Sequence, residues 1–138
     1  MELRVEKEMK IRDIQKAFSN QYPFLKIEFF KKPHAKNKLS PRAEMLSSNE
    51  PLRDFAKFRH SSQINIDGVR TIAQVEEDFW EMFGMSAQIF RKSGNIWIET
   101  SLTDGWPLDK QNREGEYFNS HIGESLDKKI DDERMDSD

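Results

Sequence analysis

Two similar segments of the sequence each predict an amphipathic helix that leads into a β-strand. In the first segment, large apolar residues recur at spacings of three and four: Ile11, Ile14, Phe18 and Tyr22. The second segment repeats these spacings: Ile72, Val75, Phe79 and Phe83. Residues at such spacings lie on one stripe of a helix. The pattern therefore predicts two helices, each with one face packed on a core.

Both predicted helices have marked ends. Pro23 should stop the first helix, because proline lacks a backbone donor and restricts the residue before it. Gly84 stands at the equivalent place after the second helix and suits the left-handed conformation that closes many helices. Thr71, followed three residues later by Gln74, is a capping-box pattern.

Each helix is followed by a stretch with strand character. The segments "KIEFFKKP" (26–33) and "SAQIFRKS" (86–93) resemble one another, and Ile-x-Ile alternation recurs in 62–67 and 95–99. We therefore expect an α+β domain with two αββ units, which form a four-stranded, largely antiparallel sheet with the helices on one face. A true duplication and a chance likeness of two amphipathic units both remain open.

The remaining segments set the expected domain boundaries. Pro107 is well placed to begin a short C-terminal helix at about 107–114, which Gly115 would end. We expect one domain over 1–123 and an acidic, disordered tail over 124–138, which holds seven acids against three basic residues.

A long basic insertion at about 33–61 should separate the two strands of the first unit. Residues 31–60 carry a local charge of +5, because eight lysine and arginine side chains outnumber three acids. The apolar residues Leu52, Phe55 and Phe58 have helical spacing and could form a short helix that docks on the core. The insertion is either a surface excursion or a basic arm that grips an acidic partner.

Strand alternation predicts two different faces on the hairpin around Ser93-Gly94-Asn95. An aliphatic face should receive the helices. The opposite face, here called the aromatic face, should hold the following residues: Glu28, Phe30, Lys32, Gln88, Phe90, Lys92, Trp97 and Glu99. With the basic insertion, this gives the candidate binding surface: Phe30, Lys32, Phe90, Lys92, Trp97, Lys36, Lys38 and Arg42.

Aromatic side chains on an outer sheet face require an explanation, because contiguous exposed apolar patches usually mark contacts. The chain could cover the face itself, through the third helix or the insertion. Alternatively, the face could bind a second copy of the chain, a foreign protein or a single-stranded nucleic acid. Glu28, Glu99 and the net charge of −3 weigh against nucleic acid.

No motif for catalysis, a cofactor or a metal is present. The chain has no cysteine, and its six glycines form neither a phosphate loop nor a nucleophile elbow. The spacing of His34, His60 and His121 matches no metal signature. A carboxylate pair of Glu99 and Asp104 stays open as a catalytic site.

The absence of cysteine fits a cytoplasmic protein. The first ten residues lack the apolar region of a secretory signal, and no run of the sequence is long and apolar enough to cross a membrane. We expect a small non-catalytic protein-binding or regulatory domain. The alternatives are a single-stranded nucleic-acid-binding module and an enzyme with a carboxylate site.

Overall fold

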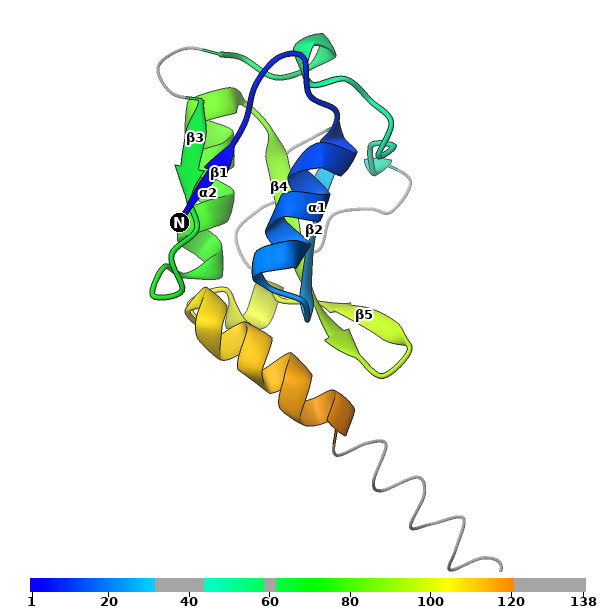
Figure 1. Cartoon of the computed structure of the whole chain (residues 1–138), viewed down its shortest axis with the longest axis vertical. Helices are drawn as coiled ribbons and strands as arrows, with labels where there is room; N and C mark the ends of the chain where they lie inside the picture. Colours follow the sequence, from blue (N-terminus) through cyan, green and yellow to red (C-terminus); the bar gives the residue numbers. More distant parts are fainter. Residues whose placement is uncertain (32–43, 59–61, 121–138) are drawn as a thin grey trace, which may run out of the picture.

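The computed structural model describes residues 1–31, 44–58 and 62–120 (Figure 1). Its elements follow the order β1 (Glu2–Arg4), α1 (Ile11–Gln21), β2 (Leu25–Phe30), β3 (Gln63–Asn65), α2 (Ile72–Phe83), β4 (Ser86–Ser93) and β5 (Ile96–Glu99). Short 3-10 turns occur at Leu52–Asp54 and Ser101–Thr103, and residues 108–120 are helical. The α+β class predicted from the sequence is confirmed.

Both predicted helices form, with the predicted ends. The Thr71 side chain accepts a hydrogen bond from the Gln74 N–H at 3.1 Å, and the Gln74 side chain accepts one from the Thr71 N–H at 3.0 Å. Gly84 has a φ of 65°, in the left-handed region where glycine is favoured. The local sequence therefore determines where α2 begins and ends.

The prediction of a single four-stranded sheet is wrong. The strands divide into a three-stranded antiparallel sheet, in the order β2-β4-β5, and a two-stranded ribbon of β1 and β3. Within the ribbon, Leu3 lies opposite Ile64. β3 forms where the alternation of 62–67 predicts a strand, but it pairs with the N-terminal strand β1.

The outer edge of β2 explains this difference, because other parts of the chain already occupy it. The Leu46 N–H donates to the Phe29 carbonyl at 2.7 Å, and the Lys31 N–H donates to the Glu44 carbonyl at 2.9 Å. Residues 44–46 thus take the hydrogen-bonding groups that β3 would need in a four-stranded sheet. Partner choice of this kind depends on the tertiary fold and not on the alternation within 62–67.

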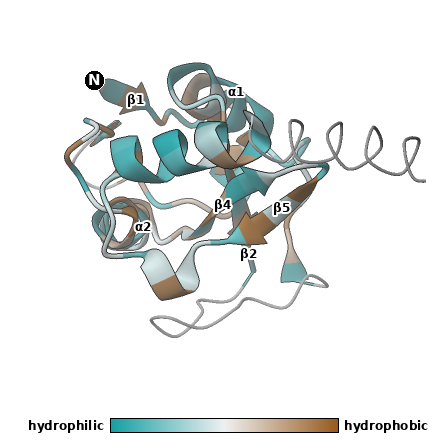
Figure 2. Cartoon of the chain, turned by 90° about the horizontal axis from the view of Figure 1, so that it is seen from below, coloured by the Kyte–Doolittle hydropathy of each residue, from teal (hydrophilic) through white to brown (hydrophobic). Residues whose placement is uncertain are grey.

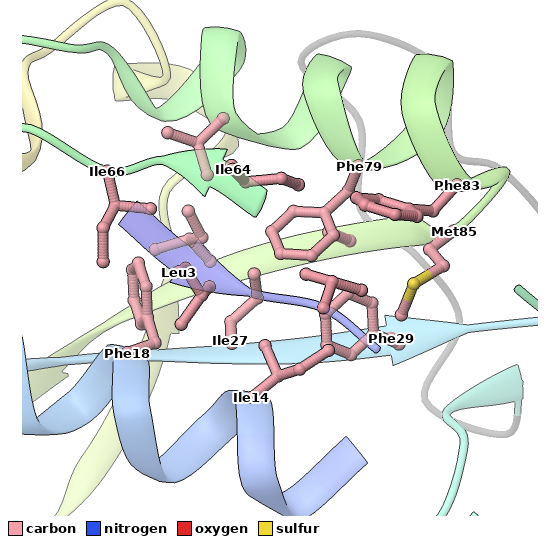
Figure 3. Close-up of a cluster of buried hydrophobic side chains, with 14 of the residues drawn as sticks. Leu3, Ile14, Phe18, Ile27, Phe29, Ile64, Ile66, Phe79, Phe83 and Met85 are labelled. Carbon is pink, nitrogen blue, oxygen red and sulfur yellow. The ribbon is translucent and has the colours of Figure 1, made fainter. Parts of the chain in front are cut away.

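One core joins the two sheets and both helices (Figure 3). α1 packs on β2 and α2 on β4, while β1 lies against α1 and β3 against α2. Phe29 of β2 and Phe79 of α2 meet edge to face at the centre, with ring centroids 5.1 Å apart. Both predicted helical stripes are buried in this core, and so is the part of the aliphatic face on β2 and β4, whereas Ile96 of β5 is 62% exposed.

The C-terminal helix is longer than predicted, and Gly115 lies inside it. The helical residues extend over 108–120. A Cβ atom on Gly115 would lie 2.8 Å from the Cβ of Phe24, closer than real contacts allow. Glycine is therefore needed at this position so that the helix can approach the segment that leads into β2.

The described part of the insertion packs apolar side chains against the core. Leu52 is buried, Phe55 and Phe58 pack against the core, and the ring centroid of Phe58 lies 5.7 Å from that of Phe83. A 3-10 turn takes the place of the short helix that the spacing suggested. Several predicted features lie outside the described residues: Lys32, Lys36, Lys38, Arg42, His34, His60, His121 and the acidic tail.

Candidate functional site

The register of the strands defines the aromatic face. β4 and β5 are joined through the two-residue turn Gly94-Asn95, which places Lys92 opposite Trp97 and Phe90 opposite Glu99. Gly94 has a φ of 63°, which suits glycine at the first position of such a turn. On the other side of β4, Lys26 lies opposite Phe90 and Glu28 opposite Gln88. Phe30, Phe90 and Trp97 therefore share one face of the sheet.

The three aromatic side chains differ in their exposure. Phe30 and Phe90 are buried, with 4% and 8% of their surface exposed, whereas Trp97 is 36% exposed. Lys92, opposite Trp97, is also exposed. Trp97 and Lys92 are thus the described members of the candidate surface that solvent reaches.

The sequence reasoning missed Lys26, which lies between two of the aromatic rings. Its Nζ is 5.2 Å from the ring centroid of Phe90 and 5.3 Å from that of Trp97. The same Nζ is 3.6 Å from Oε1 of Glu28. Alternation places Lys26 on the face of Glu28, but its position over Phe90 requires the register between β2 and β4.

The outer edge of β2 is covered by side chains of α1 as well as by Leu46. Gln15 Nε2 donates to the Ile27 carbonyl and Ser19 Oγ donates to the Leu25 carbonyl, each at 3.0 Å. Together with the bond from Leu46 to Phe29, these contacts occupy three outward-facing carbonyls of this strand. Covering an edge in this way blocks its pairing with another chain.

At Trp97, the outer edge of β5 has no comparable hydrogen-bonded cover from the described part of the chain. Within the described ranges, no residue makes a hydrogen bond to the backbone N–H or C=O of Trp97. Ile96 beside it is 62% exposed. Figure 2 shows β5 as an apolar segment at the border of the sheet. Both faces of this edge strand therefore carry an accessible large apolar side chain.

The carboxyl group of Glu76 contacts the backbone of β4 next to the last residue pair of β4 and β5. Glu76 Oε2 accepts a hydrogen bond from the Ile89 N–H at 2.8 Å, and Thr100 Oγ1 donates to the Ile89 carbonyl at 2.7 Å. Burial raises the pKa of Glu76 to about 8, and the charges of Asp104 and Glu99 add to the rise. Glu99 and Asp104, predicted as a possible carboxylate pair, thus act on a third acid that sequence reasoning missed.

At pH 7 the carboxyl group of Glu76 is therefore mainly neutral. Its observed contact is the hydrogen bond from the backbone of Ile89 in β4, so the group has a structural role. Among the residues that the structure describes, no group of three histidine or acidic side chains could hold a metal ion.

A separate groove lies at the N-terminal segment. It has a volume of about 490 Å³ and is lined by residues of the 1–9 segment and by Ala17 of α1. None of the predicted site residues lines it.

No protein-family model, curated protein or solved structure matches this chain. Among the described helices, none has the length and apolarity needed to span a membrane.

Proposed function

We propose that this chain is a small non-catalytic protein-binding domain whose contact surface is the edge strand β5 around Trp97. One observation carries the proposal: Trp97 and Ile96 expose large apolar side chains on opposite faces of an edge strand, and no described residue makes a hydrogen bond to the outward-facing backbone of Trp97. The opposite edge of the same sheet is covered by α1 and by residues 44–46.

The chemistry of this edge suits a protein partner. A free edge can extend its hydrogen-bond ladder into another polypeptide, and side chains on its two faces then provide specificity. Tryptophan is enriched among the residues that dominate protein interfaces. Asn119 Oδ1 accepts a hydrogen bond from the Gly94 N–H at 2.6 Å, which ties the turn of the hairpin to the C-terminal helix.

The alternative of single-stranded nucleic acid has less support. Base stacking requires accessible rings, and two of the three aromatic side chains on the aromatic face are buried. Glu28 and Glu99 lie on the same face and would repel phosphates.

Affinity capture with matched variants tests the proposal. The parent chain, Trp97→Glu and Trp80→Glu are immobilised and exposed to an extract of the source cells, with and without nuclease. Trp80 is a suitable control because it is also an exposed tryptophan, at 46%, but lies on α2. We expect the parent and Trp80→Glu to retain a protein that Trp97→Glu does not retain, with or without nuclease.

Two results would count against the proposal. Identical proteins on all three surfaces would show that Trp97 makes no contact of this kind. Retention that nuclease abolishes would favour the nucleic-acid alternative.

A further inference from the structure

We infer that the partner of β5 is β5 of a second copy of the chain, paired antiparallel with Trp97 opposite its own counterpart. The inference rests on the proposed function and specifies the partner of the same surface. It predicts a twofold dimer in which two three-stranded sheets join into one six-stranded sheet.

The backbone geometry provides the hydrogen-bonding groups. The Lys92 N–H donates to the Phe24 carbonyl at 2.9 Å, so Lys92 directs its backbone groups toward β2. Because directions alternate along a strand, Arg91 and Ser93 direct theirs toward β5. Their partners Ile98 and Ile96 point back toward β4. The N–H and C=O of Trp97 therefore point away from the sheet, where a second strand would add.

A pairing centred on Trp97 matches every residue of the edge with a compatible one. With Trp97 opposite its copy, the two residues exchange both hydrogen bonds as a narrow antiparallel pair. One residue away, Ile96 lies opposite Ile98 of the second copy, and this pair occurs twice by symmetry. Two residues away, Asn95 lies opposite Glu99. No like charges face each other in this register, which avoids the cross-strand repulsion that such pairs cause.

The charges around Trp97 are also balanced. Lys26, which lies over the Trp97 ring, is paired with Glu28 at 3.6 Å. Two copies of this pair would approach the twofold axis without a net charge on either side. A self-complementary patch of this kind is what an isologous interface requires.

β5 lacks three of the features that keep edge strands apart, namely lysine, proline and a bulge, although it is short and ends in Glu99. Such strands commonly carry lysine, proline or a bulge, or lie beneath another element. β5 reads Ile-Trp-Ile-Glu and pairs regularly with β4 over Ile96–Glu99. Three separate contacts cover the edge of β2 in the same sheet, whereas no described residue bonds to the outward-facing backbone of Trp97, which favours β5 as the edge that pairs.

Light scattering during size-exclusion chromatography tests the inference on the full chain, from micromolar to millimolar concentrations. We expect a mass of twice the 16.3 kDa chain at high concentration. Trp97→Glu and Trp97→Lys should each weaken the dimer roughly thirtyfold or more, because each places like charges at the axis. Trp80→Glu changes a residue of α2 that is 46% exposed, and this variant should dimerise as the parent does.

Mixing the two charged variants tests the register. Glutamate and lysine can face each other at position 97 in a mixed dimer alone, so an equimolar mixture should regain the dimer mass. An affinity tag on one variant should recover the other in equal amount. If a charged variant does not fold by circular dichroism, Ile96→Lys should also weaken the dimer, because it would place a lysine opposite Ile98 of the second copy on the other face of the strand.

Three results would overturn the inference: a monomeric parent at every concentration, a dimer that persists in Trp97→Glu, or a mixture that stays monomeric. None of them alone removes the proposed function. A monomeric parent whose Trp97 is still needed to retain a foreign protein in the capture experiment would show that β5 binds a different partner. Failure of that capture experiment as well would remove both.

Discussion

The carboxyl group of Glu76 accepts a hydrogen bond from the backbone N–H of Ile89 at 2.8 Å, just beyond the end of the β4–β5 ladder. The contact allows β5 to be short, because a side chain from α2 replaces the strand that has turned away. It also places an ionisable group beside Asp104 and Glu99, both of which disfavour its charged form.

Glu76 should make stability depend on pH. Burial and the neighbouring acids raise its pKa in the folded state from 4.5 to about 8. Between these values the folded chain holds a proton that the unfolded chain has released, so this group lowers the free energy of unfolding as pH rises from about 5 to about 8. Glu76→Gln keeps an acceptor for Ile89 and should be more stable than the parent at pH 8, by roughly 4 kcal/mol.

Urea unfolding at a series of pH values measures this effect, with Glu77→Gln as the control. Glu77 is the exposed neighbour on α2. The parent and Glu76→Gln should converge below about pH 4, where Glu76 is protonated in both states. Parallel pH profiles for the parent and both variants would contradict the role assigned to Glu76.

Tyr22 should contribute a buried hydrogen bond between the end of α1 and β3. Its hydroxyl donates to the Ile66 carbonyl, and the side chain is 2% exposed. Tyr22→Phe should cost about 1–2 kcal/mol at pH 7, because it leaves a buried carbonyl without its donor. Tyr117→Phe, at a residue 60% exposed, is the matched control and should change stability by less.

The same tyrosine predicts a loss of stability in alkali. Burial raises its pKa to about 12, with further contributions from Asp109 and Asp67. The unfolded chain releases this proton near pH 10, so the parent should lose stability between pH 10 and 12. Tyr22→Phe should lack this component. Equal losses in both chains over this range would show that another group is responsible.

Gly115→Ala should destabilise the chain although alanine favours helices. The new Cβ would lie 2.8 Å from the Cβ of Phe24 and 3.1 Å from Cγ of Arg91. Overpacking of this kind typically costs about 1–3 kcal/mol, against a gain of about 1 kcal/mol in helix propensity. Thermal unfolding measures the balance. Gly105→Ala, where a Cβ meets no atom within 4 Å, should show no clash, and a more stable Gly115→Ala would disprove the close approach.

Replacement of Phe79 should be among the substitutions that lower the free energy of unfolding most. It is fully buried and joins α2 to β2 through Phe29, with the ring centroids 5.1 Å apart. Phe79→Ala should lower the free energy of unfolding by about 3–5 kcal/mol. Trp80→Ala removes a larger side chain from the next position, yet it should lower the free energy of unfolding much less, because Trp80 is 46% exposed. Similar losses at both positions would contradict the packing of α2.

Periodicity and capping residues were enough to predict the helices and the β4–β5 hairpin. Spacings of three and four placed Ile72, Val75, Phe79 and Phe83 on the buried stripe of α2, and Thr71 and Gly84 marked its ends. Alternation along the strands placed Phe90 and Trp97 on one face under either two-residue turn. These features depend on residues close in sequence, so local geometry determines them.

Exposure on the aromatic face could not be predicted in this way. Alternation assigns Phe30 and Phe90 to the same face as Trp97, but it contains no information about what covers them. The structure buries both of these rings and leaves Trp97 partly open. The lysine between Phe90 and Trp97 depends equally on how β2 and β4 are aligned.

The sequence by itself determined the two amphipathic helices, their ends, most strands and the α+β class, because each follows from spacing or from the conformational limits of single residues. Tertiary structure alone decided that β3 pairs with β1, since residues 44–46 and two side chains of α1 occupy the edge of β2. It also decided that Gly115 serves close packing instead of ending a helix. Strand pairing and close packing bring together groups that are distant in sequence. Which groups meet therefore depends on the arrangement of the whole chain, and local spacing does not specify it.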